Sequence, residues 1–189
     1  DTDNDRFVVV PVRKSARVLV VGNSTDDDTS IVSLALNPGD MTGIGTVAAT
    51  AATLRDMTEL KFSECDAIFV LGVERLEEAA ARRLYDYVSA GGGVVFFTGP
   101  IVDVKSWNEI MYNDGNGVFP VALDGAVEVP VAVDAETVDI RPERHPVWSH
   151  VLDVKNSPLA LVQVREVLRP ALEWSAAKEN VQVLATVRG

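Results

Sequence analysis

Three consecutive aspartates, Asp26, Asp27 and Asp28, form the densest group of side chains in the sequence that could bind a metal ion. Carboxylate oxygens are hard ligands that suit magnesium or calcium. Adjacent residues of a strand or helix point in different directions, however, and the alternating aspartates of calcium-binding loops are absent. The three carboxylates would also repel a phosphate group. We therefore interpret them as the acidic start of a helix, where they favour the helix dipole, and expect no bound metal.

A nucleophile is the second kind of chemistry to look for, at the turn "FFTGP" (96–100) after an apolar run. Acyl-transfer enzymes with α/β topology hold a serine or cysteine at such a turn, together with a histidine base. The hydroxyl available here is Thr98, which is a poor nucleophile without a base. Cys65 precedes the apolar run "AIFVLG", at its amino end, which is the wrong edge of a parallel sheet for catalysis. We interpret Cys65 as a structural thiol.

The two histidines, His145 and His150, are five residues apart, and Pro146 disfavours a helix between them. This spacing argues against a zinc-binding pair. We interpret "RHPVW" as a turn that places Val147 and Trp148 on the core. An enzyme of unknown type, a hydrolase or transferase that uses Thr98, the aspartates at 26–28 and His145, stays open as an alternative.

Aromatic side chains could line a sugar-binding groove or anchor a protein partner. Two pairs come into question, Trp107 with Tyr112 and Trp148 with Phe119. Helical spacing already accounts for Trp107 as a core residue, so we favour core positions, and a carbohydrate-binding domain remains a third hypothesis. We interpret the acids between 134 and 143 as surface carboxylates: Asp134, Glu136, Asp139 and Glu143.

Composition limits the partners that these groups could serve. The chain has 189 residues, enough for one domain with its own core, and a formal net charge of -11 from 17 basic and 28 acidic side chains. Such a surface repels nucleic acid and anionic lipid. One cysteine excludes an internal disulfide framework. No apolar run approaches the roughly 18 to 20 residues that span a bilayer.

The elements that must position these groups follow a repeating order. Three continuous apolar runs, at 16–24, 65–72 and 94–99, predict strands buried on both faces of a parallel sheet. A short strand is expected near 46–49. Helical spacing of Ile31, Leu34 and Ala35 predicts the first crossover helix. The resulting order predicts an α/β fold with helices on both faces of the sheet.

Two further helices are predicted from apolar stripes. The first, within 74–93, carries Leu76, Ala80, Leu84 and Val88, and the second, over 102–114, carries Val104, Trp107, Ile110 and Met111. Strand-like stretches at 160–168 and 180–187 should extend the sheet or form a β layer beside it. Residues 1–14, with Pro11, are predicted to be the tail of a preceding β domain or an edge strand. Residues 15–189 are predicted to form the α/β domain, cut short at its C-terminus.

Ligands of open parallel sheets bind outside the carboxyl ends of the strands. The turns at 22–28, 72–75 and 98–103 are therefore the positions to inspect. Our candidate ligand-binding residues at these turns are Asn23, Asp26, Thr98, Gly99 and Asp103.

Three segments carry a resemblance to a known family: "ARVLVVG" (16–22), "CDAIFVLGVERLEEAAARRLYDYVSAGGGVVFFTGP" (65–100) and "VDVKSWNEIMYNDGNGVFPVAL" (102–123). Together they resemble the class I glutamine amidotransferase-like domain of large bacterial membrane-anchored proteins that contain a von Willebrand factor A module of the aerotolerance type. The resemblance covers roughly residues 6–170. It implies a flavodoxin-like, doubly wound fold within a membrane-anchored parent, and a preceding β-sandwich-like region that ends near residue 13.

The resemblance also implies that amidotransferase chemistry is missing. A working glutaminase of that superfamily presents G-x-C-x-G at the strand end, and a late histidine and glutamate complete its triad. This sequence has "FFTGP" there, and His145 is followed by Pro146. We therefore expect a pseudoenzyme with no catalytic residue, no cofactor and no metal. It would bind a protein partner, other domains of its own chain or a small ligand, and it would meet the membrane only through other parts of the parent.

Overall fold

The computed structural model describes residues 15–23, 27–38, 46–131, 138–152, 157–171 and 181–188. The predicted tail at 1–14 and the candidate ligand Asp26 lie outside these described residues, as do Asp134 and Glu136. The chain divides into two compact units. The first comprises Asp1–Leu71 and Ser89–Phe96, and the second comprises Gly72–Val88 and Phe97–Gly189.

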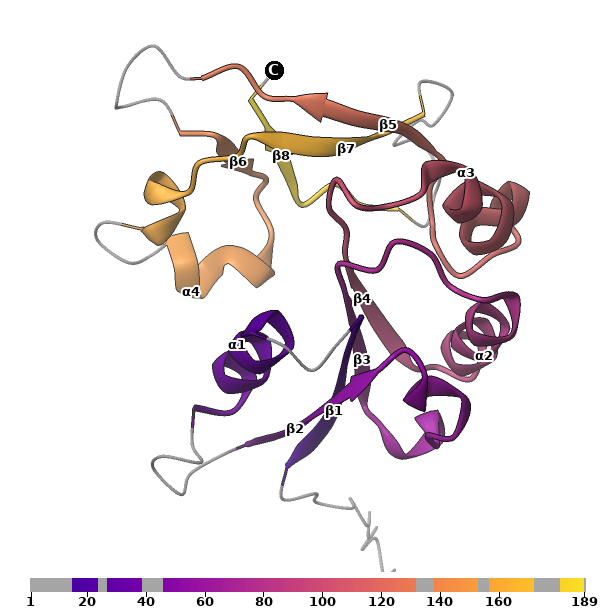
Figure 1. Ribbon diagram of the computed structural model, residues 1–189. Coiled ribbons are helices and arrows are strands. Elements are labelled where there is room, and N and C mark those ends of the chain that lie inside the picture. The colour runs from indigo at the N-terminus through magenta and orange to yellow at the C-terminus, as the bar shows by residue number, and fades with distance from the viewer. Residues whose placement is uncertain are drawn as a thin grey trace, which may run out of the picture. The chain divides into compact units, whose positions relative to one another are not determined.

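The first unit is built on a four-stranded parallel sheet (Figure 1). Its strands are β1 (Ala16–Gly22), β2 (Val47–Thr53), β3 (Ala67–Leu71) and β4 (Gly93–Phe97), in the order β2-β1-β3-β4. Strand β2 pairs with one edge of β1, and β3 pairs with the other edge. This strand order is that of flavodoxin-like folds. The predicted α/β, flavodoxin-like fold class is confirmed.

Strand β1 forms the centre of this sheet because its side chains are apolar on both faces. Residues Val18 to Gly22 are all buried, and Val20 and Val21 have no exposed surface. Its register with β2 runs from Ala16 opposite Val47 to Gly22 opposite Thr53. The predicted short strand at 46–49 is thus the beginning of a seven-residue strand, because pairing with β1 outweighs the weak strand preference of alanine.

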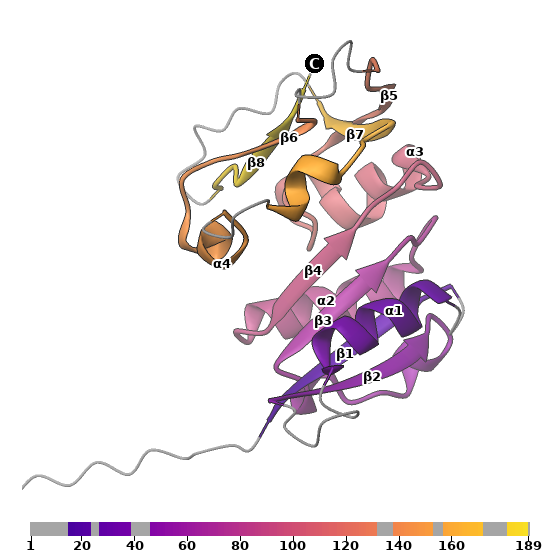
Figure 2. The same ribbon diagram turned by 90° about the vertical axis from the view of Figure 1, so that its left-hand side faces the viewer.

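Helix α1 (Asp27–Leu36) packs on the sheet through a different stripe from the one predicted. Val32 and Leu36 contact the core cluster of Val18, Val20 and Leu71, and Figure 2 shows the helix lying over one face of the sheet. The helix predicted from the spacing of Ile31, Leu34 and Ala35 is present, but Ile31 is 62% exposed and Leu34 is 56% exposed. The helix is apolar on two sides, and spacing alone could not select between them.

Strand β4 also differs from expectation. The sequence predicts burial on both faces, but β4 is the last strand in the sheet order, and Val95 and Phe97 are 41% and 47% exposed. A continuous apolar run therefore marks an edge strand here. The crossover from β2 to β3 holds two short 3-10 turns, η2 (Asp56–Thr58) and η3 (Phe62–Glu64), whose Met57 and Phe62 are buried.

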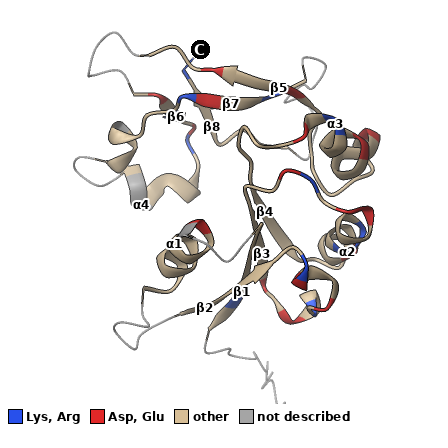
Figure 3. Ribbon diagram, in the orientation of Figure 1, with Lys and Arg blue, Asp and Glu red and all other residues tan. Residues whose placement is uncertain are grey.

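The second unit contains the clearest predicted helix, α2 (Glu78–Ser89). Leu76, Ala80 and Leu84 are buried as expected, whereas Val88 is exposed and Tyr87 takes the last buried position. The Arg82 guanidinium lies 3.2 Å from the carboxylate of Asp86 one turn on. Figure 3 shows acidic and basic residues mixed along this helix, as its solvated face requires.

The predicted helix at 102–114 is present, but it changes its winding. A single α-turn, α3 (Val104–Ser106), passes into the π-helical η4 (Trp107–Tyr112) and then the 3-10 turn η5 (Asn113–Gly115). Trp107 and Met111 are buried, as the apolar stripe predicts. The segment ends in left-handed backbone at Asn113 and Asp114, with φ angles of 46° and 52°.

The late strands form separate small sheets and do not extend the parallel sheet. Strand β5 (Leu123–Glu128) pairs with β7 (Glu166–Pro170), and β6 (Ile140–Pro142) pairs with β8 (Ala185–Val187), both antiparallel. Of the stretch predicted at 160–168, the first part is the 3-10 turn η7 (Pro158–Leu161), because Pro158 follows the capping side chain of Ser157. The turn η6 (Pro146–Trp148) and the short helix α4 (Ser149–Leu152) connect β6 to it. Among the described residues, no helix is long and apolar enough to cross a membrane.

Candidate functional site

Thr98 and Gly99, two of the candidate ligand-binding residues, line a groove of about 640 Å³ in the second unit. We call it the β7 groove. It is lined by residues 98–100, 127–130, 166–170, 183 and 185–188. Most of these residues are valine, leucine, alanine or proline, so the groove offers an apolar surface. Its volume lies in the range of roughly 300 to 1,000 Å³ that small-molecule sites occupy.

The groove follows the backbone of two strands. All five residues of β7 and all three residues of β8 line it. Because consecutive residues of a strand point to opposite faces, a groove that touches every residue runs along a strand edge and not only along one face. Each of these strands has one partner in its two-stranded sheet. In the described part of the chain, the second edge of each strand has no neighbouring strand.

Asn108, which the sequence analysis did not single out, anchors the start of β5, the strand whose far end lines the groove. Its side-chain amide donates to the Leu123 carbonyl oxygen and its side-chain oxygen accepts from the Leu123 N–H, both at 2.8 Å. This pair of bonds imitates a strand partner at the start of β5. Directly after it, the register of β5 shifts at Gly125, whose φ of 133° favours glycine. Strand β7 pairs with β5 on both sides of this bulge, from Leu123 opposite Pro170 to Glu128 opposite Glu166.

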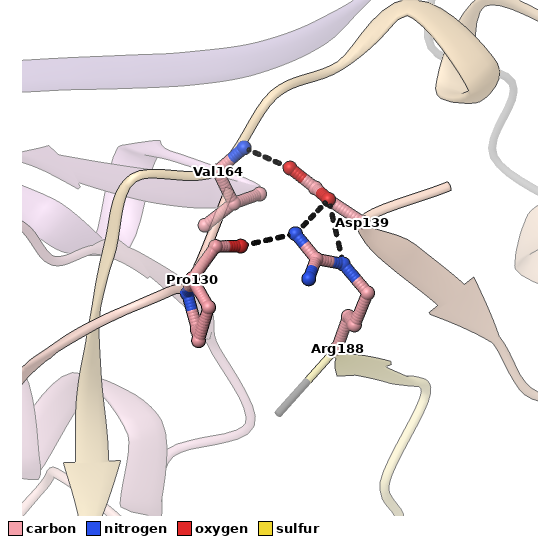
Figure 4. Close-up of polar contacts among 4 residues, drawn as sticks. All are labelled: Pro130, Asp139, Val164 and Arg188. Atoms are coloured by element: carbon pink, nitrogen blue, oxygen red, sulfur yellow. Dashed lines mark hydrogen bonds and ion pairs between the residues drawn. The ribbon is translucent and has the colours of Figure 1, made fainter. Parts of the chain in front are cut away.

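One wall of the groove is fixed by Asp139 and Arg188 (Figure 4). The Arg188 Nη2 and Nε atoms donate to one Asp139 carboxylate oxygen at 2.9 and 3.1 Å, and the Val164 N–H donates to the other oxygen at 2.8 Å. Arg188 also donates to the Pro130 carbonyl oxygen. The prediction of a surface carboxylate at 139 was wrong, because Asp139 is only 7% exposed. A buried carboxylate with three donors joins β6, β8 and the segments at 130 and 164.

These contacts change the acidity of the carboxyl group. The hydrogen bond from the Val164 N–H, followed by those from Arg188, lowers the pKa of Asp139 below its ordinary value. The group therefore stays ionised in mildly acidic solution. The sequence did not predict the contact between Arg188 and Asp139. Arg188 follows a strand-like run, and a single charged residue in that position does not indicate which acid it pairs with.

Asp103 and Asn23, the other candidate residues that the structure describes, are not part of the groove lining. Asp103 caps α3, since its carboxylate accepts from the Ser106 N–H at 3.3 Å. The Asp103 N–H and the Trp107 indole N–H both donate to the carbonyl oxygen of Glu74, each at 2.9 Å. Asn23 follows β1 in the first unit and is exposed. The structure thus brings Thr98 and Gly99 to one groove and gives Asp103 a capping role.

The polar side chains of the groove lining carry hydroxyl, carboxylate and guanidinium groups. Its lining contains the hydroxyls of Thr98 and Thr186, and within the described residues no histidine or cysteine lines it. The His145 Nδ1 atom accepts from the Val147 N–H at 3.1 Å and caps η6. Val147 is exposed, so the prediction that it packs on the core was wrong, whereas Trp148 is half-buried and its indole N–H donates to the Leu184 carbonyl oxygen. No group of three histidine, cysteine or acidic residues able to hold a metal occurs in these ranges.

Cys65 lies two residues before β3, at the amino end of that strand, and is half-buried. Burial raises the pKa of the Cys65 thiol, and the neighbouring Arg17 opposes this effect only in part. A raised pKa keeps the sulfur protonated near neutral pH, which is the opposite of what a nucleophilic cysteine requires.

The aromatic rings considered for sugar binding take other positions. Trp107 is 2% exposed and meets Phe119 edge to face, with ring centroids 5.0 Å apart. A buried indole with its N–H bonded to Glu74 cannot serve as a platform for a sugar ring. Trp107 is a core residue, as its helical spacing predicts.

Comparisons with known proteins return no match to a protein family, to a curated protein or to a solved structure. The β7 groove is therefore the feature from which a function must be argued.

Proposed function

We propose that this chain is a non-catalytic, glutamine amidotransferase-like module of a larger membrane-anchored protein, and that it binds a protein partner in the β7 groove. The observation that carries this proposal is the groove itself, an apolar channel of about 640 Å³ along two strand edges. Strand edges recognise extended peptides through main-chain hydrogen bonds, and apolar walls select their side chains.

The chemistry at the end of β4 supports the absence of amidotransferase activity. Thioester formation needs a thiolate at that turn and a base to receive its proton. Thr98 occupies the turn, and the chain's cysteine stands before β3 with a raised thiol pKa. The described lining of the groove supplies a hydroxyl without a histidine to activate it.

A small apolar ligand is the second candidate for this groove. Its volume and its aliphatic lining also suit a compact molecule. The two candidates differ in one respect. A small ligand would fill part of the groove, whereas a peptide would pair with the backbone along β7.

Binding of a fluorescent, valine- and threonine-rich octapeptide tests the proposal. We expect the chain to raise the anisotropy of this peptide, and Thr186→Trp to abolish the effect by filling the groove from an exposed strand position. Thr58→Trp, at an exposed threonine in the first unit, is the matched control and should bind normally. Equal binding by the wild type and Thr186→Trp would contradict the proposal, and ammonia release from glutamine would contradict its non-catalytic part.

A further inference from the structure

Among the described residues, the positively charged side chains of the β7 groove form ion pairs and the negatively charged ones do not. Four charged side chains line it in the described chain: Glu128, Glu166, Arg169 and Arg188. Arg188 is bonded to the buried Asp139, and Arg169 forms an ion pair with Asp124. Both positive charges therefore already have a partner outside the groove lining.

The two glutamates, in contrast, face each other. Glu128 at the end of β5 is directly opposite Glu166 at the start of β7 in the antiparallel register, and Figure 3 colours both strand ends red. Opposite residues in such a pair have Cβ atoms about 4.5 to 5.5 Å apart on one face, and like charges there destabilise the sheet. Neither glutamate forms an ion pair within the described residues. Arg165, the residue before Glu166, is exposed but does not line the groove.

We infer that the β7 groove receives an extended, aliphatic peptide segment that carries a lysine or arginine at the position beside Glu128 and Glu166. This inference rests on the proposed function and adds the chemistry of the partner. A cation placed between two opposed carboxylates would remove their repulsion, while valine- or isoleucine-like side chains would cover the apolar walls. The peptide backbone would pair with the edge of β7 that lies away from β5, which has no neighbouring strand among the described residues.

Other occupants fit the same features less well. Calcium and magnesium take six or more oxygen ligands, and the described groove offers two exposed glutamates at this end. An anionic lipid or a phosphate would meet those carboxylates first and be repelled. An aliphatic molecule without charge would leave their repulsion in place.

Three octapeptides that differ only in one terminal residue test the inference by fluorescence anisotropy. They share a valine- and threonine-rich core and end in lysine, glutamine or glutamate. We expect the lysine peptide to bind about tenfold tighter than the glutamate peptide, with the glutamine peptide between them. The preference should shrink as sodium chloride rises from 20 to 300 mM, because salt screens exposed charges.

The double variant Glu128→Gln/Glu166→Gln separates charge recognition from binding itself. It should bind the glutamine peptide as the wild type does and lose the preference for lysine over glutamate. Glu143→Gln, at an exposed acid outside the groove lining, is the matched control and should keep the preference. Removal of the repulsion should leave the thermal midpoint of the double variant unchanged or raised, which checks that it folds.

The possible outcomes distinguish a failure of this inference from a failure of the proposed function. Peptide binding with equal affinity for all three termini would overturn this inference and leave the proposed function standing. Absence of binding by all three peptides would overturn both. Tight binding of calcium alone, measured by calorimetry and lost in the double variant, would assign the glutamate pair to a metal and overturn the inference as well.

Discussion

At the scale of single residues, Asp139 joins the sheet of β6 and β8 to the segment that leads into β7. Its carboxylate accepts hydrogen bonds from Val164 and Arg188 and lies in a buried position. Asp139→Asn removes the negative charge and replaces one carboxylate oxygen by an NH2 group, which cannot accept a hydrogen bond from these donors. We expect it to lower the thermal midpoint at pH 7 by about 5 °C or more, because the partly buried guanidinium of Arg188 loses its countercharge. Differential scanning calorimetry would measure the change, with Glu143→Asn as the exposed control.

The pH dependence of that loss follows from the direction of the pKa shift. Since the folded-state pKa of Asp139 lies below the unfolded value of about 3.9, the carboxylate contributes stability above that value and loses it as pH falls through the folded pKa. The difference in midpoint between wild type and Asp139→Asn should therefore be constant from pH 7 to 5 and shrink below pH 4. A difference that persists at pH 2.5 would mean that packing, and not the charge, is responsible.

Cys65 permits a second test at this scale. Burial raises its thiol pKa, so the reactive thiolate forms at higher pH than in a free cysteine. Alkylation by iodoacetamide should be slower than that of glutathione at pH 7.5, and the pH at which the rate is half-maximal should lie above about 8.5. Mass spectrometry of the alkylated chain would follow the reaction. Rapid labelling at pH 6.5 would indicate an activated thiolate and would reopen the question of catalysis.

At the scale of elements, Gly117 in the turn after η5 has no room for a side chain. A Cβ atom on Gly117 would come within 1.9 Å of the Met111 carbonyl oxygen, so the backbone of η4 would have to shift. We expect Gly117→Ala to lower the thermal midpoint by about 5 °C or more. Gly99→Ala is the matched control, since nothing lies within 4 Å of its Cβ position, and its midpoint should stay within about 2 °C of wild type. Equal midpoints for the two variants would contradict the tight packing at Gly117.

The helices and strands of the first unit show which features could be predicted from the sequence and which could not. A run such as Val18 to Val21 is apolar on both faces and predicts a strand, and here that strand lies at the centre of the sheet. Helix α1 has two apolar stripes, and only its contact with the sheet selects Val32 and Leu36. Strand β4 has an apolar sequence at an edge, which depends on the strand order and not on its own residues.

The place of Thr98 and Gly99 in the fold could be predicted, because they follow the end of a parallel strand, and both line the β7 groove. The contacts that hold the surrounding strands could not be predicted. Asn108 bonds to Leu123 and Asp139 bonds to Arg188, across sequence separations of 15 and 49 residues. Nothing in the local pattern around any of these residues specifies such a pairing.

At the scale of the whole molecule, the dominant property is the net charge of -11. Exposed ion pairs such as Arg82 with Asp86 contribute little, so added salt should screen repulsion more than attraction. We expect the thermal midpoint to rise by a few degrees, roughly 2 to 4 °C, between 10 and 300 mM sodium chloride at pH 7.5. A midpoint that falls as salt is added would mean that attractive pairs, and not the excess of acids, control the stability of this chain.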